Sequence, residues 1–105
     1  MEGREGREKI GSIPSRLLRQ IQGFAKQRGI REVILFGSRA RGTHRERSDI
    51  DLAARGGDFD GFYWDIREKA DSLLMFDLVE LDAGISEELR KEIERDGLTL
   101  YEETG

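Results

Sequence analysis

The chain contains no cysteine, one proline and no long apolar run. Without cysteine it can have neither a disulfide framework nor a thiolate metal site, and nothing requires an oxidising compartment, so we predict a cytoplasmic protein. No segment approaches the roughly 18 consecutive apolar residues of a membrane span. The first residues, Met1 to Lys9, have no apolar signal region either, and we therefore predict neither a membrane anchor nor a secretion signal.

An excess of positive charge is also missing. The net charge is -4 at pH 7, which argues against a broad electrostatic grip on nucleic acid or on an anionic membrane and favours a basic protein partner. The 105 residues suffice for one compact domain with a small core. We predict a flexible charged start over residues 1–11 and a single domain over residues 12–105, which a partner or an oligomer would stabilise.

The spacing of apolar residues predicts alternating helices and strands. Apolar residues at helical spacing predict helices over residues 14–29, 59–74 and 86–97. Short apolar or alternating runs predict strands over 33–36, 49–53 and 76–82, with a helical turn after Ser38 and an edge strand over 98–101. This order is typical of an α+β protein in which helices are laid over a small sheet.

Two carboxylates stand out because they share one face of a predicted strand. Asp49 and Asp51 lie two residues apart, so both point the same way, while Ile50 and Leu52 between and beside them point into the core. Two carboxylates so placed repel each other unless a cation lies between them. Hard divalent cations such as Mg²⁺ or Mn²⁺ bind carboxylate oxygens together with substrate phosphates, which is the chemistry of phosphoryl-type transfer.

A third carboxylate on a neighbouring strand would complete such a metal site. The run from Phe76 to Asp82 offers Asp77 on one face and Glu80 or Asp82 on the other. We favour Asp77, because the apolar residues on both sides of it would fix it on an interior strand. A slip of one residue in the register would bring Glu80 or Asp82 to the site instead.

The segment before the paired aspartates has the features of a phosphate-binding turn. Gly37 and Ser38 follow a buried strand and open a helical turn, where backbone N–H groups favour a phosphate and glycine permits its close approach. Arg41 lies one helical turn after Ser38 and shares its face, whereas Arg39 should point elsewhere. His44 is the only histidine and lacks the companions of a metal site, so we assign it no catalytic role.

Trp64 is unusual because it falls on the polar side of the predicted helix over residues 59–74. A tryptophan on a polar face is often an anchor in a protein interface. The other interpretation is that a loop covers it, and the sequence does not decide between the two.

One pattern resembles the signature of the polymerase-beta-type nucleotidyltransferases. It consists of Gly37-Ser38, ten intervening residues and then Asp49-Ile50-Asp51. The local form, LFGSRARGTHRERSDIDLA, is similar to the small stand-alone members called minimal nucleotidyltransferases. The resemblance is most specific over residues 35–53 and weaker elsewhere between 33 and 101. It implies a polymerase-beta-like nucleotidyltransferase fold, that is, an α+β domain with helices packed on a small mixed sheet.

The resemblance also implies roles for these residues. In that family the two signature aspartates bind the metal ions, here Asp49 and Asp51, and a third carboxylate, here Asp77, joins one metal and helps to deprotonate the acceptor. The Gly37-Ser38 turn would hold the triphosphate of ATP, and by our geometric argument Arg41 would assist it.

Many minimal nucleotidyltransferases are antitoxins of a helical ribonuclease of the HEPN family, and some transfer AMP to a tyrosine of that toxin. The resemblance therefore implies a Mg²⁺-dependent or Mn²⁺-dependent protein adenylyltransferase with a HEPN toxin as partner. The alternative is a non-catalytic antitoxin that acts by contact alone. Transfer to a small molecule or to an RNA end is disfavoured by the short chain and its acidity.

Overall fold

The structure of the protein is a computed structural model, which describes residues 13–42, 49–70, 72 and 75–103. The predicted flexible start, residues 1–11, lies outside these residues, as does His44. The helices and strands follow one another as α2 (Ser15–Gln27), β1 (Glu32–Phe36), the one-turn helix α3 (Ser38–Arg41), β2 (Ile50–Arg55), α4 (Phe59–Lys69), β3 (Phe76–Glu80), the 3-10 helix η1 (Leu81–Ala83), α5 (Glu87–Asp96) and β4 (Leu98–Glu102). No helix in this part of the chain has the length and apolar character that a membrane crossing requires.

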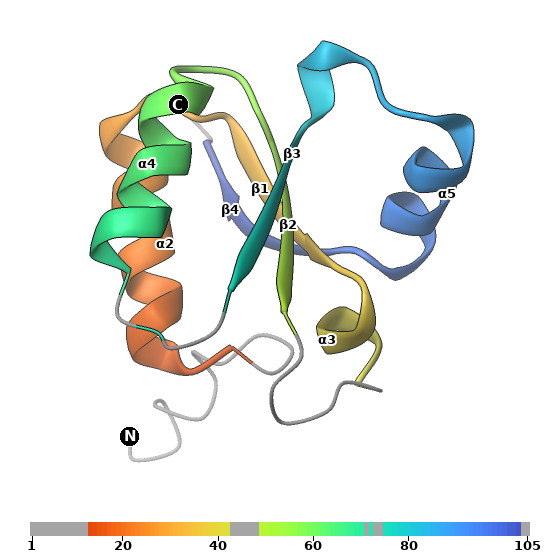
Figure 1. Ribbon diagram of the computed structural model, residues 1–105, viewed down its shortest axis with the longest axis horizontal. Coiled ribbons are helices and arrows are strands. Elements are labelled where there is room, and N and C mark those ends of the chain that lie inside the picture. The colour runs from red at the N-terminus through yellow and green to blue at the C-terminus, as the bar shows by residue number, and fades with distance from the viewer. Residues whose placement is uncertain (1–12, 43–48, 71, 73–74, 104–105) are drawn as a thin grey trace.

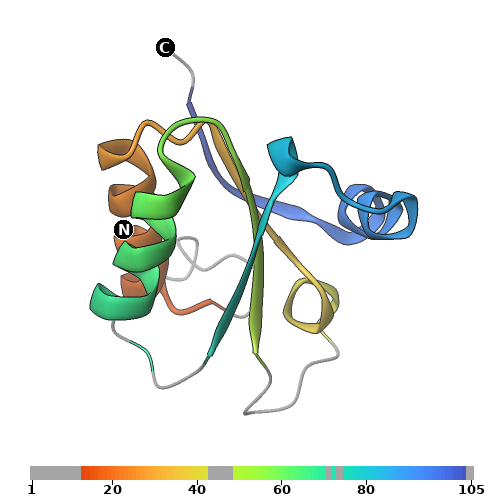
Figure 2. The same ribbon diagram turned by 45° about the horizontal axis from the view of Figure 1, so that its top comes forward.

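The four strands form one mixed sheet in the order β3-β2-β1-β4. Strand β1 runs antiparallel to β2 and to β4, whereas β2 and β3 are parallel. Helices α2 and α4 lie side by side over one face of the sheet, and α3 and α5 lie on the other face (Figures 1 and 2). The structure thus confirms the predicted α+β fold, in which helices pack on a small mixed sheet.

Alternation along the central strands divides the core in two. Ile50 and Leu52 of β2 are fully buried in the main core beneath α2 and α4, as the sequence predicted. Side chains of the opposite parity face α5, where Phe36, Ala53 and Ile93 form a smaller core. Because this second core is small, polar residues on the α5 side of the sheet remain accessible at the ends of the strands.

The second long helix is shorter than its sequence pattern indicates. Helix α4 ends at Lys69, and Ala70 already has an extended backbone, although its N–H still donates to Ile66 O. The predicted helix up to Leu74 is therefore wrong, and Leu73 and Leu74 lie outside the described residues. The physical reason is that the chain must turn after α4 to enter β3 in the direction parallel to β2.

The strands that carry the candidate carboxylates also differ from prediction. Strand β2 begins at Ile50, so Asp49 immediately precedes it, and β3 ends at Glu80, so Asp82 lies in the 3-10 helix. Within the described part of the chain, β3 pairs only with β2 and is an edge strand, whereas we predicted an interior position for Asp77. Apolar neighbours show that a strand is buried on a face, but they do not show which strands lie beside it.

A buried ion pair joins the end of α2 to α4. The Asp65 carboxylate, whose side chain is 4% exposed, accepts hydrogen bonds from Arg28 Nε at 2.9 Å and Arg28 Nη2 at 3.2 Å, and Lys69 Nζ lies 3.2 Å away. The hydrogen bonds from Arg28 outweigh the effect of burial and, with Lys69, hold the pKa of Asp65 below its usual value. The carboxylate therefore stabilises the folded state in its charged form.

Asp65→Asn is expected to lower the free energy of unfolding by roughly 1.5–3 kcal/mol at neutral pH, because hydrogen bonds to a charged acceptor are lost. Since the folded pKa is depressed, this contribution is complete above the ordinary aspartate pKa of about 3.9 and is lost as the pH falls through the folded value. Urea denaturation at several pH values measures both effects. Asp60→Asn, at an exposed position of the same helix, is the matched control; an equal loss in both variants would contradict the assignment.

Candidate active site

The candidate site lies where β1 ends and β2 and β3 begin. Asp51 of β2 stands opposite Phe36, the last residue of β1, on one side and opposite Asp77 of β3 on the other. Paired residues of parallel strands point to the same face, and neighbouring strands lie about 4.8 Å apart. The structure therefore brings Asp51 and Asp77 together on the α5 side of the sheet, with Asp49 directly before β2.

These carboxylates act on one another electrostatically. Partial burial, followed by the negative charges of Asp77, Asp49 and Glu92, raises the pKa of Asp51, and the positive charge of Arg41 opposes this shift. Asp49 and Asp77 are exposed, and Asp51 is partly buried. Several negative charges thus lie close to one half-buried carboxylate. A bound cation would reduce the repulsion between them.

The donor set fits a hard divalent cation that arrives with a phosphate ligand. Within residues 13–42, 49–70, 72 and 75–103, no three acidic or histidine side chains converge closely enough to hold a metal ion by themselves. Mg²⁺ does not require such a cage, because it usually binds one or two carboxylates and takes its remaining ligands from substrate phosphates and water. The register pair Asp51 and Asp77, with Asp49 nearby, supplies carboxylates of this kind.

Gly37 brings the backbone against Asp51. It has φ 79° and ψ -158°, and a Cβ added at this position would collide with the Asp51 carboxylate and lie 3.2 Å from its Cγ. Only glycine adopts this backbone and leaves this space. The turn after β1 and the first half of β2 are therefore fitted to each other at the atomic level.

Gly37→Ala should displace the Asp51 carboxylate and weaken metal-dependent nucleotide binding by at least about tenfold, since a misplaced ligand loses charge-assisted contacts. Gly42→Ala is the matched control, because Gly42 also has a positive φ of 81° but a Cβ there meets nothing within 4 Å. Backbone strain of roughly 1–2 kcal/mol is expected in Gly42→Ala, whose backbone is left-handed helical, and more in Gly37→Ala, whose φ and ψ suit glycine alone. The thermal midpoint of Gly37→Ala should therefore fall further, and both affinities are measured at a temperature at which each variant is folded. Calorimetric titration of both proteins with MgATP isolates the effect on Asp51; equal affinities would refute it.

The two arginines of α3 lie in different environments. Arg41 is exposed at the mouth of the site, and its Nη1 lies 3.5 Å from Glu92 Oε2 and 3.5 Å from Asp96 Oδ2, both on α5. Arg39 is buried, with 6% of its surface accessible. Of the two, only Arg41 is exposed enough for its guanidinium to leave the carboxylates of Glu92 and Asp96 and bind a phosphate instead.

Ser38 is the first residue of α3, beside the arginines. The N–H groups of Ala40 and Arg41 both donate to Gly37 O at 3.1 Å, so the Ser38 N–H precedes the first hydrogen bonds of the turn. A helix of one turn has a small dipole, and phosphate binding here would depend on individual N–H groups and on Arg41.

The two alternative third carboxylates lie at the other end of β3. Glu80 stands opposite Ala54, three residues along the strand from the pair that contains Asp77, or about 10 Å. Asp82 accepts a hydrogen bond from the Gly56 N–H at 2.9 Å. Neither is brought to Asp51.

Glu92 is a member of the acidic cluster that the sequence analysis missed. It lies on α5, and its charge reaches Asp51 only because α5 packs across this side of the sheet. Glu92 lies one turn before Asp96 on an acidic face of α5. Nothing in the sequence around it indicates that it lies near the ends of the strands.

A cavity in the described part of the chain does not coincide with this cluster. It has a volume of about 550 Å³ and lies between α5, η1 and the far end of the sheet, where Ile34, Ile85 and Ile93 line its apolar side and Arg55 its rim. Asp51 precedes Arg55 by four residues along β2, about 13 Å. The carboxylates therefore lie on a different part of the surface.

The chain thus combines a mixed four-stranded sheet with two register-paired carboxylates, Asp51 and Asp77, beside a glycine turn. The family model described as "Polymerase beta, Nucleotidyltransferase" matches residues 19–104. The chain therefore belongs to this nucleotidyltransferase family. No curated protein shows a significant match to it.

Solved structures with the same fold include components of toxin–antitoxin systems. A toxin-antitoxin crystal structure with AMP-PNP is 23% identical in sequence, with a TM-score of 0.61 over 83% of this chain and 74% of that chain. A mutant of the toxin-antitoxin MntA-HpeT is 22% identical, with a TM-score of 0.65 over the same shares of the two chains. At this level of identity the likeness establishes the fold.

Proposed function

We propose that this nucleotidyltransferase transfers AMP from ATP to a hydroxyl group of a protein partner, with Mg²⁺ or Mn²⁺, and that it serves as the antitoxin of a HEPN-type toxin. The observation that carries the proposal is the register pairing of Asp51 with Asp77 next to the close approach of Gly37. In this proposal the carboxylates bind the metal, and the neighbouring Gly37-Ser38 turn receives the triphosphate.

Each group has a defined task in this proposal. The Gly37-Ser38 turn and Arg41 bind the triphosphate, and Asp49, Asp51 and Asp77 hold the metal. A bound divalent ion would supply charge stabilisation to the phosphates. Asp77, exposed on the edge strand, accepts the proton of the incoming hydroxyl.

The transfer balances without any further reactant. The acceptor oxygen forms a bond to the α-phosphorus of ATP, the bond from that phosphorus to the β-phosphate oxygen breaks, and pyrophosphate leaves. The proton of the hydroxyl passes to Asp77 and then to solvent. The products are an AMP ester on the partner and pyrophosphate.

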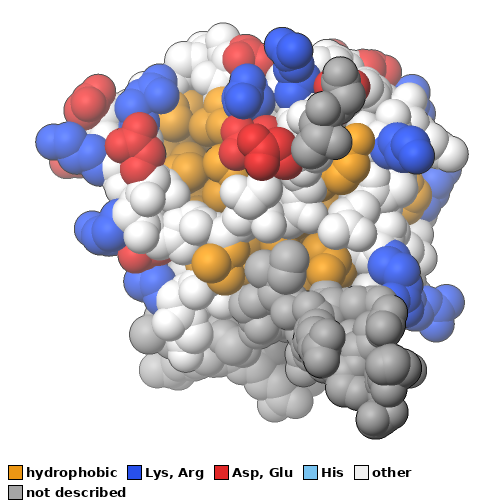
Figure 3. Space-filling model, turned by 180° about the vertical axis from the view of Figure 1, so that it is seen from behind, with side chains coloured by type: hydrophobic (Ala, Val, Ile, Leu, Met, Phe, Trp, Pro, Cys, Tyr) orange, Lys and Arg blue, Asp and Glu red, His pale blue; other side chains and the backbone are white. Residues whose placement is uncertain are grey.

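Three observations support a protein as acceptor. The net charge of -4 opposes nucleic acid. Figure 3 shows basic and acidic side chains interspersed on the described part of the rear face, where they do not form one continuous basic patch. The solved relatives that share the fold are toxin–antitoxin proteins, one of them with AMP-PNP.

The decisive experiment is mass spectrometry of the partner. The first step is to determine whether the adjacent reading frame encodes a small helical protein. That protein, purified and incubated with the chain, ATP and Mg²⁺, is the probe. We expect an AMP-sized increase in its mass, on a tyrosine, that requires both ATP and metal. A partner that stays unmodified but is fully inhibited would overturn the enzymatic proposal and favour an antitoxin that acts by contact alone.

The phosphate-binding turn can be tested apart from the acceptor. Ser38→Ala with Arg41→Ala is expected to weaken MgATP affinity by roughly tenfold to a hundredfold, because hydrogen bonds to charged groups are worth about 1.5–3 kcal/mol. The fold should stay intact, since Ser38 is partly exposed and Arg41 is exposed. Arg55→Ala, which removes a guanidinium at the far end of the same sheet, is the control, and isothermal titration calorimetry is the measurement.

A further inference from the structure

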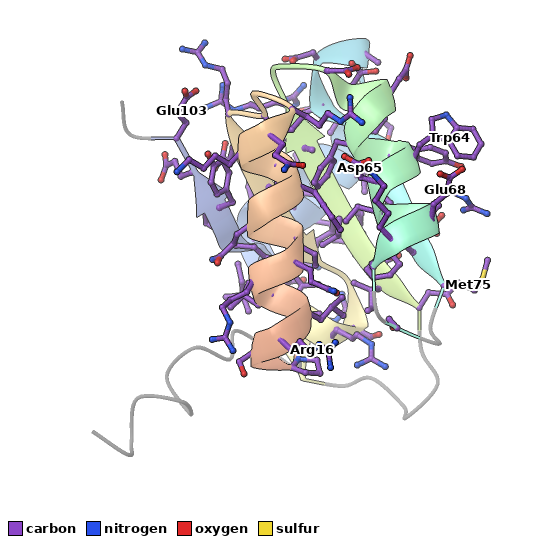
Figure 4. The ribbon with its side chains drawn as sticks, turned by 90° about the vertical axis from the view of Figure 1, so that its left-hand side faces the viewer. Arg16, Trp64, Asp65, Glu68, Met75 and Glu103 are labelled. Carbon is purple, nitrogen blue, oxygen red and sulfur yellow. The ribbon has the colours of Figure 1, made fainter. Side chains whose placement is uncertain are left out.

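Two large hydrophobic side chains are exposed in the described part of the chain, and they lie on the same side of it. Trp64 of α4 is 54% exposed, and Met75, directly before β3, is 59% exposed. Figure 4 shows both projecting from that side, with Glu68 between them. Exposed side chains of this size gathered beside one strand are typical of a surface that another protein covers.

The indole of Trp64 is held in place before any partner arrives. Its ring meets the ring of Tyr63 edge to face, with centroids 5.2 Å apart and an interplanar angle of 86°. Tyr63 is itself supported, because the Phe59 ring lies 6.5 Å away and the guanidinium of Arg67 lies 5.4 Å from the Tyr63 ring centroid. An aromatic anchor that is already ordered loses little conformational entropy on binding.

The free edge of β3 connects this surface to the candidate active site. Among the residues that the structure describes, β3 pairs with β2 alone. The Met75 carbonyl accepts a hydrogen bond from the Ile50 N–H, so Met75 is fixed at the point where the strand begins. Asp77 follows two residues later and faces the α5 side of the sheet, as its register partner Asp51 does. A protein that covers Trp64, Met75 and the outer edge of β3 thus reaches the exposed carboxylate of Asp77.

The charges around the surface indicate the kind of protein that fits it. Asp60, Glu68 and Asp77 are exposed acids on its rim. The nearby cations are already engaged, Arg67 over the Tyr63 ring and Lys69 with Asp65. The surface therefore has an apolar centre and an acidic rim, which complements a partner that presents an apolar patch among lysine and arginine side chains.

We propose that Trp64, Met75 and the free edge of β3, which we call the Trp64 surface, dock the acceptor protein beside Asp77. This proposal rests on the proposed function, because it assigns to the acceptor a place beside the transfer site. The occupant is the basic, helical acceptor protein rather than a second copy of this acidic chain.

The test measures binding and transfer separately, on the chain and its purified helical acceptor protein. Trp64→Ala with Met75→Ala should raise the Kd for the acceptor at least tenfold and raise its KM for AMP transfer, while kcat and MgATP affinity stay unchanged. Glu87→Ala, an exposed change on α5, is the control. Circular dichroism should show that both proteins are folded. An unchanged Kd in the Trp64 and Met75 variant would overturn the docking proposal.

A second measurement does not depend on catalysis. Trp64 is the only tryptophan, so the chain labelled with 5-fluorotryptophan gives one ¹⁹F resonance, which should shift when the acceptor protein is added to Asp77→Asn. Failure of the shift would overturn the Trp64 surface even if AMP transfer occurs. A shift with no AMP transfer by the wild-type chain would overturn the proposed function and leave the docking surface standing. Analytical ultracentrifugation tests for a dimer of the wild-type chain. If Trp64→Ala dissociates such a dimer and leaves the affinity for the acceptor unchanged, the surface binds a second copy of the chain and the proposal is refuted.

Discussion

Asp77→Asn is expected to reduce AMP transfer to the partner by roughly 10² to 10⁴-fold, the usual contribution of a positioned proton acceptor, and by more where a metal ligand is lost as well. The substitution keeps the size of the side chain and removes its charge. Because Asp77 is exposed at the edge of the sheet, the fold should be unaffected. The effect should fall on kcat rather than on the affinity for the partner, since complex formation with the partner does not require this carboxylate.

Two comparisons make the result specific. Asp82→Asn removes an acid of the same type near the other end of β3, where it accepts a hydrogen bond from Gly56, and transfer should persist. The Asp77→Asn protein should still form a complex with its partner in size-exclusion chromatography. Undiminished transfer by Asp77→Asn together with loss in Glu80→Gln or Asp82→Asn would move the third role to the far end of the strand.

Local patterns in the sequence were sufficient to predict the order of the main helices and strands and the face of β2 on which Asp51 lies. The alternation around Ile50 and Leu52 identifies β2 and the face on which Asp51 lies, because side-chain direction follows directly from a strand repeat of two. The predicted glycine turn likewise coincides with a positive φ at Gly37. These features depend on a few consecutive residues, and the structure retains them.

The errors concern relations between distant segments. Strand β3 is an edge strand because β2 lies between it and β1, and the strand order depends on how the helical crossover packs rather than on the residues of β3. The periodicity of apolar residues continues past Lys69, although the need to turn into β3 ends the helix there. Glu92 reaches the acidic cluster only through the packing of α5. A one-dimensional pattern holds none of this information.

The edge position of β3 changes how the site is understood. A carboxylate on an interior strand would face a substrate enclosed by its neighbours, whereas Asp77 on an edge strand is open to a large acceptor. In the proposed function, the nucleotide binds at Gly37 and Arg41, and the acceptor approaches from the open side of Asp77. This geometry suits transfer to the surface of another folded protein better than transfer to a small molecule that needs an enclosing pocket.

Asp49→Asn with Asp51→Asn is expected to abolish the metal-dependent part of ATP binding, because both changes remove negative ligands from a hard-cation site. Thermal shift with ATP and Mg²⁺, Mn²⁺ or EDTA measures this. The wild-type chain should be stabilised only when nucleotide and metal are both present. Asp60→Asn, an exposed acid on the opposite side of the sheet, should respond as wild type does. Metal-dependent stabilisation that survives in the double variant would show that the site lies elsewhere.

Asp51→Asn alone should separate function from stability. Burial and the neighbouring charges of Asp77, Asp49 and Glu92 raise the pKa of Asp51, so its charged form is less favourable in the folded chain than in the unfolded one. The sign follows from linkage: stability is greatest while Asp51 is protonated, below the unfolded pKa, and is lost as the pH rises through the raised folded pKa. Asparagine removes this loss, so at pH 7 the nucleotide-free variant should melt at a higher temperature than wild type while binding MgATP less tightly. In the wild-type chain, MgATP binding should fail on acidification at a pH above the ordinary aspartate pKa of about 3.9.

A lower melting temperature for the nucleotide-free Asp51→Asn chain would mean that the carboxylate stabilises the fold. The predicted rise would instead mean that the charge of Asp51 lowers the stability of the fold and is retained because it binds the metal.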